Sequence, residues 1–275
     1  MLNLPNLRDV VTKYELLAKK SLGQNFLLDT NITNKIIRLS LAAQNKTDFH
    51  TDLVYEIGPG PGGLTQAILQ QNPQCLTVIE MDSRCIQIMA DLKHIVGNQL
   101  QIIEGDALKF DYTSSAQAPQ IISNLPYNIS VPLLVGWLKN MQHFTALTLM
   151  FQKEVADRIC AEPDNKNYGR ISVLAQLTCN IKTLLNLNPN CFVPAPKIWS
   201  TVLLFQPLSI IPAPDLLEKV EKITTLAFGQ RRKMIRQSLK SIPNLESICR
   251  QADIDLTVRA ENITPKQYLK LAELI

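Results

Sequence analysis

What this 275-residue chain lacks excludes several kinds of protein. Its six cysteines contain no Cys-x-x-Cys pair and its three histidines are scattered, so the ligand spacing of a structural zinc site is absent. No apolar run approaches the roughly 20 residues of a membrane-spanning helix. Residues 1–25 contain no continuous apolar core of a secretory signal. We therefore expect reduced thiols, no metal ion, and a cytoplasmic protein.

Charge is also scarce, because only 19% of the residues are charged and the net charge is +4. This mildly basic balance is weak support for any particular partner, so the positions of the basic residues matter more than their number. Hydrophobic residues make up 46% of the chain, which suffices for a substantial core.

Strand-like and helix-like segments alternate over much of the chain, which predicts an α/β fold with right-handed crossovers and a parallel sheet covered on both faces. The expected strands are Leu53–Ile57, Leu76–Glu80, Leu100–Glu104, Gln120–Ser123, Leu147–Gln152, Ile181–Leu187 and Thr201–Gln206. The expected helices between and around them are Thr30–Ala43, Gly63–Gln71, Arg84–Leu92 and Val131–Asn140, with a helical turn or two around Leu16-Leu17.

The alternation ends at residues 207–214, which contain three prolines. Beyond them only helices are expected, over Leu216–Phe228, Lys233–Ser241 and Pro265–Leu274. We predict a catalytic domain over residues 1–207, of which 1–30 form a lead-in and a loop over a cofactor. A small all-helical domain follows over residues 208–275.

A glycine-rich turn between the first expected strand and its helix indicates a nucleoside-bearing cofactor. Gly58, Gly60 and Gly63 match G-x-G-x-x-G, in which glycines permit a tight turn and close approach of the backbone to the ligand. Glu80 ends the next expected strand, where an acid can accept both ribose hydroxyls. Asp106 follows the third expected strand, where it can bind an adenine amino group. A plain strand-to-helix turn, with solvated acids at the strand ends, is the alternative interpretation.

The tetrad Asn124-Leu125-Pro126-Tyr127 indicates the chemistry, because it follows the fourth expected strand and so projects beside the cofactor. The Asn124 side-chain oxygen and the Leu125 carbonyl can accept the two hydrogens of a planar amino group. Pro126 stiffens the turn and Tyr127 offers a face on which an extruded base can stack. This predicts a Rossmann-like methyltransferase that uses S-adenosylmethionine to methylate a base amine. A protein amide is the competing substrate, and a nicotinamide-dependent dehydrogenase is the competing enzyme class.

Motifs along nearly the whole chain resemble the ribosomal RNA adenine dimethyltransferase family, most closely its bacterial small-subunit type. The matching segments are Ser21–Leu27, Glu56–Gly60, Asn124–Ser130, Phe151–Ala156, Tyr168–Val173, Phe192–Lys197, Phe228–Lys233 and Arg259–Asn262. Trp199 departs from the family pattern, which has a small polar or acidic residue there, and we expect it to leave activity intact.

The resemblance implies the residues of both sites. The cofactor-binding residues would be Gln24, Asn25, Leu27, Glu56, Gly58, Gly60, Glu80, Asp106, Ala107 and Asn124. The catalytic set would be the tetrad with Phe192, which the resemblance stacks on the target adenine opposite Tyr127. Its place before a Val-Pro-Ala-Pro loop would otherwise make Phe192 a core residue. The implied substrate is two adjacent adenosines near the 3′ end of small-subunit (16S-type) ribosomal RNA, each dimethylated on an assembling small subunit, and we expect a monomer.

A basic segment in the helical domain predicts the surface that contacts RNA or the ribosome. Residues 229–240 contain five cations and no acid, namely Arg231, Arg232, Lys233, Arg236 and Lys240. If this segment is one helix, Arg232 and Arg236 lie on the same face, where they can contact phosphates. A solvated helix face is the alternative. Two other functions stay open: an assembly factor that acts mainly by binding, and a resistance-type methyltransferase of large-subunit RNA.

Overall fold

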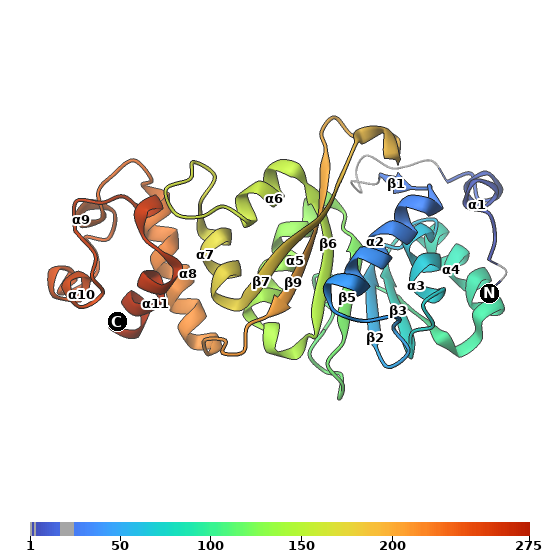
Figure 1. Cartoon of the computed structure of the whole chain (residues 1–275), viewed down its shortest axis with the longest axis horizontal. Coiled ribbons are helices and arrows are strands. Elements are labelled where there is room, and N and C mark those ends of the chain that lie inside the picture. Colours follow the sequence, from blue (N-terminus) through green and yellow to red (C-terminus); the bar gives the residue numbers. More distant parts are fainter. Residues whose placement is uncertain (1, 3, 17–24) are drawn as a thin grey trace. The chain divides into compact units, whose positions relative to one another are not determined.

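The computed structural model describes residues 2, 4–16 and 25–275 (Figure 1). The chain divides into two compact units. Unit 1 contains the chain up to Leu134 together with His143–Lys153 and Lys182–Phe205, and unit 2 contains Val135–Gln142, Glu154–Ile181 and Gln206–Ile275. A single boundary at residue 207 therefore does not describe this division, because residues 154–181 pack with the helical tail.

Seven strands form one sheet in the order β4-β3-β2-β5-β6-β9-β7. They are β2 (Leu53–Ile57), β3 (Cys75–Glu80), β4 (Leu100–Glu104), β5 (Gln120–Asn124), β6 (Ala146–Gln152), β7 (Cys179–Leu187) and β9 (Ser200–Pro207). The first five strands of this order, β4-β3-β2-β5-β6, pair in parallel, as predicted. Strand β9 runs antiparallel to β6, so the expectation of an all-parallel sheet was wrong at this edge.

The helices of unit 1 flank the parallel strands in chain order. They are α1 (Leu7–Lys13), α2 (Thr30–Ala43), α3 (Gly63–Leu69), α4 (Ser83–Val96) and α5 (Tyr127–Lys139), the last of which continues into unit 2. Helix α1 begins after Asn6, whose side chain accepts a hydrogen bond from the Arg8 amide. The predicted turn around Leu16 was therefore placed too late, and Leu17 lies outside the described residues.

A short two-stranded pairing completes unit 1 beside the carboxyl edge of the sheet. Strand β1 (Phe26–Leu27) pairs antiparallel with β8 (Phe192–Val193). The β1 backbone lies so close to the start of α3 that a Cβ atom on Gly63 would be 2.3 Å from the Leu27 carbonyl oxygen. Glycine at position 63 is therefore required for close packing between β1 and α3.

Unit 2 is helical and is held together by an aromatic core. Its helices are α6 (Lys153–Ile159), α7 (Arg170–Thr178), α8 (Pro214–Gly229), α9 (Ile235–Ser238), α10 (Leu245–Gln251) and α11 (Pro265–Glu273), with the first residue of α6 in unit 1. Tyr168 and Tyr268 are fully buried and both contact the Phe228 ring. Their hydroxyl groups donate to main-chain carbonyls, as buried tyrosines require.

Within the described ranges, no helix combines the length and the apolar composition that a bilayer crossing needs. The same residues contain no group of three or more His, Cys, Asp or Glu side chains arranged to hold a metal ion.

We expect Gly63→Ala to lower the free energy of unfolding by roughly 1–3 kcal/mol, because β1 must move away from the added methyl group. Gly136→Ala is the matched control, since Gly136 lies in the exposed interior of α5 with no atom within 4 Å of an added Cβ. That change should raise the free energy of unfolding by about 0.5–1 kcal/mol. Urea unfolding measures both, and an unchanged midpoint for Gly63→Ala would contradict the packing argument.

Candidate active site

A cavity of about 340 Å³ opens at the carboxyl edge of the parallel strands in unit 1. Its wall comes from the segments that follow β2, β3, β4 and β5, and from β1. From β2 the chain builds the sheet in one direction through β3 and β4, and then returns to add β5 on the other side of β2. Open α/β sheets bind ligands at such a switch point in the strand order. The size suits a small-molecule ligand such as a nucleoside.

Two glycines of the predicted turn bring the backbone to the cavity surface. Gly58 and Gly60 have φ of 64° and 56°, in the left-handed region that favours glycine. An added Cβ would lie 3.3 Å from Pro126 Cγ at Gly58 and 3.1 Å from the Phe26 ring at Gly60. The turn thus leaves open space on the cavity side only because these positions lack side chains.

The two acids predicted from strand ends both line the cavity. One oxygen of Glu80 accepts hydrogen bonds from the Met81 amide at 2.8 Å and the Asp82 amide at 2.9 Å, which fixes the carboxylate. Asp106 accepts from the Leu108 amide at 3.0 Å. Burial raises the pKa of Glu80, and the amide hydrogen bonds oppose this rise.

Glu56 supplies a third carboxyl group, which is almost wholly buried at the end of β2. Burial raises its pKa to about 8, and the nearby Glu80 carboxylate adds to the rise. Hydrogen bonds from Thr65 oppose it. The Glu56 Oε2 atom has no hydrogen-bond partner among the described residues. Such an atom is costly to bury, so the free site leaves Glu56 without a polar partner that a ligand can provide.

The acidic lining of the cavity favours a cationic ligand. Three carboxyl groups line it, and no Lys, Arg or His does so among the described residues. S-adenosylmethionine fits this lining, because it carries a sulfonium and an ammonium group and its ribose can bind an acid. The pyrophosphate of a nicotinamide dinucleotide would instead face unbalanced negative charge. The lining therefore disfavours the dehydrogenase interpretation.

The predicted tetrad forms the far side of the same cavity. Ser123 donates to the Ile57 carbonyl at 2.7 Å, which joins the ends of β5 and β2. The Asn124 side-chain nitrogen donates to the Asn25 carbonyl at 3.2 Å, so its Oδ1 atom remains oriented as an acceptor. Tyr127 begins α5, and its hydroxyl lies 2.9 Å from the Ser200 hydroxyl.

The structure brings most of the predicted site residues together, but not all of them. Asn25, Leu27 and Ala107 line the cavity with the residues described above. Gln24 lies outside the described residues. Phe192 is 2% exposed and belongs to the hydrophobic core behind β1, not to the cavity wall. Its stacking on a target base stays a prediction. The structure places Phe192 in the core, as its sequence context alone suggested.

Sequence reasoning missed several cavity residues. These include Phe26, Met81, Leu108 and Asn128. Met81 directly follows Glu80, and Leu108 comes two residues after Asp106. Both side chains are apolar but exposed. Their position shortly after a strand-end acid was a weak signal, because a flat adenine ring needs apolar contacts on its faces but the sequence does not show which apolar residues are exposed.

The basic segment of unit 2 does not form the predicted helix. Helix α8 ends at Gly229, and α9 is limited to four residues, Ile235–Ser238. Just before α9, Met234 pairs with Arg259, and the amide of Ile235, the first residue of α9, donates to the Val258 carbonyl at 2.8 Å. The prediction of one helix over Lys233–Ser241 was therefore right only for Ile235–Ser238, because the backbone just before α9 pairs with a distant segment. Arg232 and Arg236 are not neighbours one helical turn apart.

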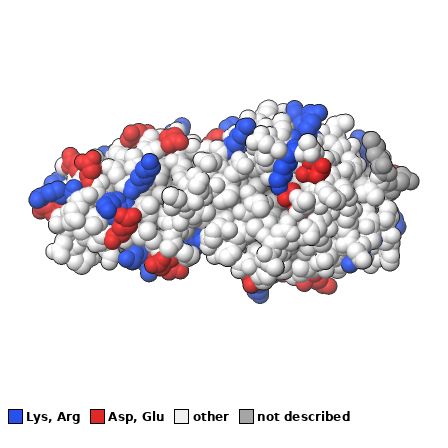
Figure 2. Space-filling model, turned by 60° about the horizontal axis from the view of Figure 1, so that its bottom comes forward, with Lys and Arg blue, Asp and Glu red and all other residues white. Residues whose placement is uncertain are grey.

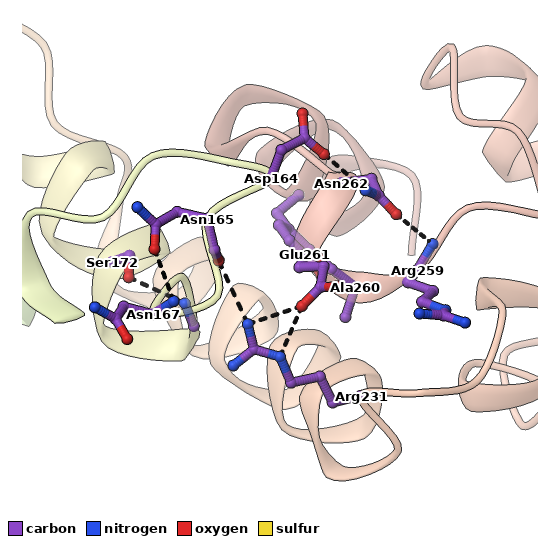
Figure 3. A network of polar contacts seen from close by, with 11 residues as sticks. Asp164, Asn165, Asn167, Ser172, Arg231, Arg259, Ala260, Glu261 and Asn262 are labelled. Carbon is purple, nitrogen blue, oxygen red and sulfur yellow. Dashed lines mark hydrogen bonds and ion pairs between the residues drawn. The ribbon is translucent and has the colours of Figure 1, made fainter.

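Four of the five predicted RNA contacts are exposed side chains: Arg232, Lys233, Arg236 and Lys240. On the face drawn in Figure 2, acidic groups lie among the basic ones at the left, where unit 2 is. Arg231 differs from the other four. Its guanidinium contacts Glu261 at 2.8 Å and the Asn165 carbonyl at 3.4 Å (Figure 3), so we keep only the other four as candidates for phosphate contacts.

The Arg259–Asn262 motif is the centre of a polar network in unit 2 (Figure 3). The Asn262 side chain donates to Asp164 at 2.7 Å and accepts from the Arg259 amide at 2.8 Å. The Asp164 amide donates to the Glu261 carbonyl at 2.9 Å. Three segments distant in sequence, around residues 164, 231 and 261, are therefore joined.

The mixed sheet, the switch-point cavity and its acidic lining define a methyltransferase of the Rossmann-like class. A sequence model of the family described as ribosomal RNA adenine dimethylase matches residues 16–275. The chain belongs to this family, and it is an S-adenosylmethionine-dependent methyltransferase whose substrate class is ribosomal RNA.

Relatives match nearly the full chain. The ribosomal RNA small subunit methyltransferase A of Rhodospirillum rubrum is 45% identical over 273 residues, covering 99% of this chain and 93% of the relative. That of Sinorhizobium medicae is 43% identical over 276 residues, covering 99% and 98%.

Two solved structures share the fold. A dimethyladenosine transferase from Plasmodium falciparum is 25% identical with a TM-score of 0.70, covering 88% of this chain and 94% of that one. The 23S rRNA methyltransferase ErmE is 21% identical with a TM-score of 0.65, covering 90% and 98%.

The buried Glu56 carboxyl predicts a pH dependence of stability. Because its pKa is raised from 4.5 to about 8, its contribution is fully present below about pH 4.5 and is lost as the pH rises to about 8. Glu56→Gln removes this titration and keeps the shape. We expect the free energy of unfolding of the variant relative to the wild type to increase by a few kcal/mol between pH 5 and pH 8.

Urea unfolding without cofactor at several pH values measures this difference, in which other titrating groups largely cancel. Isothermal titration should also show weaker binding of S-adenosylmethionine to the variant. A difference in stability that stays constant from pH 5 to pH 8 would mean that Glu56 is ionised in the free protein.

Proposed function

We propose that this protein transfers methyl groups from S-adenosylmethionine to the exocyclic amino groups of two adjacent adenosines near the 3′ end of small-subunit ribosomal RNA. The observation that carries the proposal is the pairing, in one cavity, of an acidic lining that lacks cations among the described residues with the Asn124 acceptor. The first suits a cationic methyl donor, and the second suits an amino group.

The carboxyl groups of the cavity would hold the cofactor. Glu56 would release its proton and accept from the ammonium group of the methionine part, which supplies the partner that its Oε2 atom lacks. Glu80, oriented by two amides, would accept from the ribose hydroxyls, and Asp106 from the adenine amino group. When bound, the cofactor supplies an electrophilic methyl group on a sulfonium.

The tetrad would prepare the target nitrogen. The lone pair of an adenine amino group is delocalised into the ring, so the nitrogen is a poor nucleophile. Asn124 Oδ1 and the Leu125 carbonyl would accept its two hydrogens, which favours a pyramidal nitrogen with its lone pair directed at the methyl group. Tyr127 would stack on the extruded base. Positioning and electrostatics then suffice, without a strong base.

The small-subunit branch of the family is favoured over the large-subunit branch. The two curated relatives described above are named small subunit methyltransferase A and cover nearly the whole chain, whereas ErmE is related by fold at 21% identity. We infer that the substrate is an assembling small subunit in the cytoplasm, bound by a monomer. An assembly factor that acts mainly by binding is the second candidate, since the exposed cations of unit 2 could serve either role.

Labelled S-adenosylmethionine and small subunits that lack these methyl groups test the proposal. We expect dimethyladenosine in a 3′-terminal fragment of the digested RNA. The double variant Asn124→Ala, Tyr127→Ala should still bind particles but transfer methyl groups at least roughly 100-fold more slowly, because it loses an acceptor and a stacking face. Label in large-subunit RNA would identify the resistance-type activity. Cofactor binding without label in any RNA would favour the assembly factor.

A charge-reversal pair tests the basic surface of unit 2. Arg232→Glu with Arg236→Glu should weaken binding to small subunits and lower the slope of log K against log salt by about 1 for each lost phosphate contact. Arg250→Glu with Lys270→Glu is the matched control, because it makes the same change of charge at exposed helix positions. Affinity for S-adenosylmethionine should stay the same in both. If the control loses particle binding equally, the overall charge of the protein, and not this basic surface, determines the binding.

A further inference from the structure

An exposed tryptophan lies on the segment that connects β8 with β9. The chain has two tryptophans: Trp137 is 3% exposed, whereas Trp199 is 48% exposed. Single exposed apolar residues need no explanation. Here, however, Val193 at the end of β8 and Ile198 on the connecting segment are also exposed, so three large apolar side chains face water within seven residues.

This segment adjoins the candidate active site in unit 1. Strand β8 pairs with β1, whose residues line the cavity, and Figure 1 shows the gold segment around β8 above β1. Ser200, the residue after Trp199, places its hydroxyl 2.9 Å from the hydroxyl of Tyr127. The indole of Trp199 is therefore carried by backbone attached to the target end of the cavity.

The backbone at Trp199 is fixed on both sides. Its carbonyl accepts a hydrogen bond from the Lys153 amide at 2.8 Å, and Ser200 begins β9, where it pairs with Gln152. On α5, Val131 lies one helical turn after Tyr127 and is exposed as well. A rigid aromatic surface on fixed backbone needs little ordering when it binds a flat ligand.

We propose that Trp199 stacks on an unpaired nucleobase that neighbours the target adenosine in the RNA strand. This inference rests on the proposed function and adds a second base-binding position to it. An indole stacks on any base, and an unpaired base beside an extruded nucleotide has lost its own stacking partner. The exposed Lys197, two residues earlier, is suited to the phosphate of the same nucleotide. Val193 and Ile198 add exposed apolar side chains within the same seven residues.

Two substitutions separate stacking from mere bulk. Trp199→Leu keeps an apolar side chain without an aromatic face, and we expect kcat/KM on small subunits that lack the methyl groups to fall roughly tenfold. Trp199→Phe keeps a smaller aromatic face and should stay within about threefold of the wild type. Ile95→Ala removes an exposed apolar side chain on α4 and is the control, with no expected change. Wild-type kcat/KM for Trp199→Leu would overturn the proposal.

Fluorescence gives a second reading that does not require methyl transfer. Subtracting the emission of Trp199→Phe from that of the wild type isolates Trp199. The probe is an RNA hairpin whose loop holds two adjacent adenosines, compared with the same hairpin with one abasic site in place of either adenosine. We expect the intact loop to quench Trp199 emission and the abasic loops to quench it less.

The outcomes distinguish the two proposals. If the wild type methylates no small subunit, the proposed function fails, and the quenching alone decides whether Trp199 stacks on a base. If Trp199→Leu is slow on particles but quenching is absent or insensitive to the abasic site, the indole contacts something other than a base, such as a ribosomal protein. That result would overturn the stacking inference and leave the proposed function intact.

Discussion

The burial of the Glu56 carboxyl group at the end of β2 is the constraint on which the active site depends. A carboxyl group in this position is tolerated only if it holds its proton or receives a cation, since isolated buried charge is costly. Glu80 lies nearby and raises the pKa of Glu56 further, so the free cavity is poised to accept positive charge. The same feature explains why the site suits a sulfonium cofactor and disfavours a dinucleotide, although both classes of enzyme share the glycine turn.

Close backbone contact is the second requirement of this site. Gly58 and Gly60 keep the turn clear, and Gly63 lets β1 lie against α3. Because β1 also pairs with β8, the wall of the cavity is connected to the segment that carries Trp199. Residues far apart in sequence thus lie at one edge of the sheet, where the β1–β8 pairing and the side-chain hydrogen bonds of Ser123, Asn124 and Tyr127 hold them together.

Much of the sheet could be predicted from the sequence, because the parallel strands are short apolar runs bounded by turn residues. Leu53–Ile57, Leu100–Glu104 and the helix Thr30–Ala43 have the predicted bounds. Pairing between distant segments could not be predicted in this way. Strands of two residues, such as β1 and β8, are too short to show an alternating sequence pattern. In the basic segment, the spacing of the cations suggests a helix, but Met234 pairs with Arg259 instead.

The candidate site was predictable where a residue type and a strand end coincide, as for Glu80, Asp106 and Asn124. Apolar residues of the cavity were missed, since exposure of Met81 and Leu108 cannot be read from an apolar residue in a sequence. Helices α6 and α7 were also missed. Each is short and the two are separated by a polar loop, so neither shows a long periodic pattern of apolar residues.

The network around Glu261 has a consequence for building hybrids of this protein with its relatives. Arg231, Asp164 and the Arg259–Asn262 motif belong to three separate stretches of chain, but they bond to one another. In a chimera that exchanges only the carboxyl-terminal stretch, the Arg259–Asn262 motif would come from one parent and its partners Asp164 and Arg231 from the other. Such hybrids therefore need their crossover points chosen so that all three stretches come from the same parent.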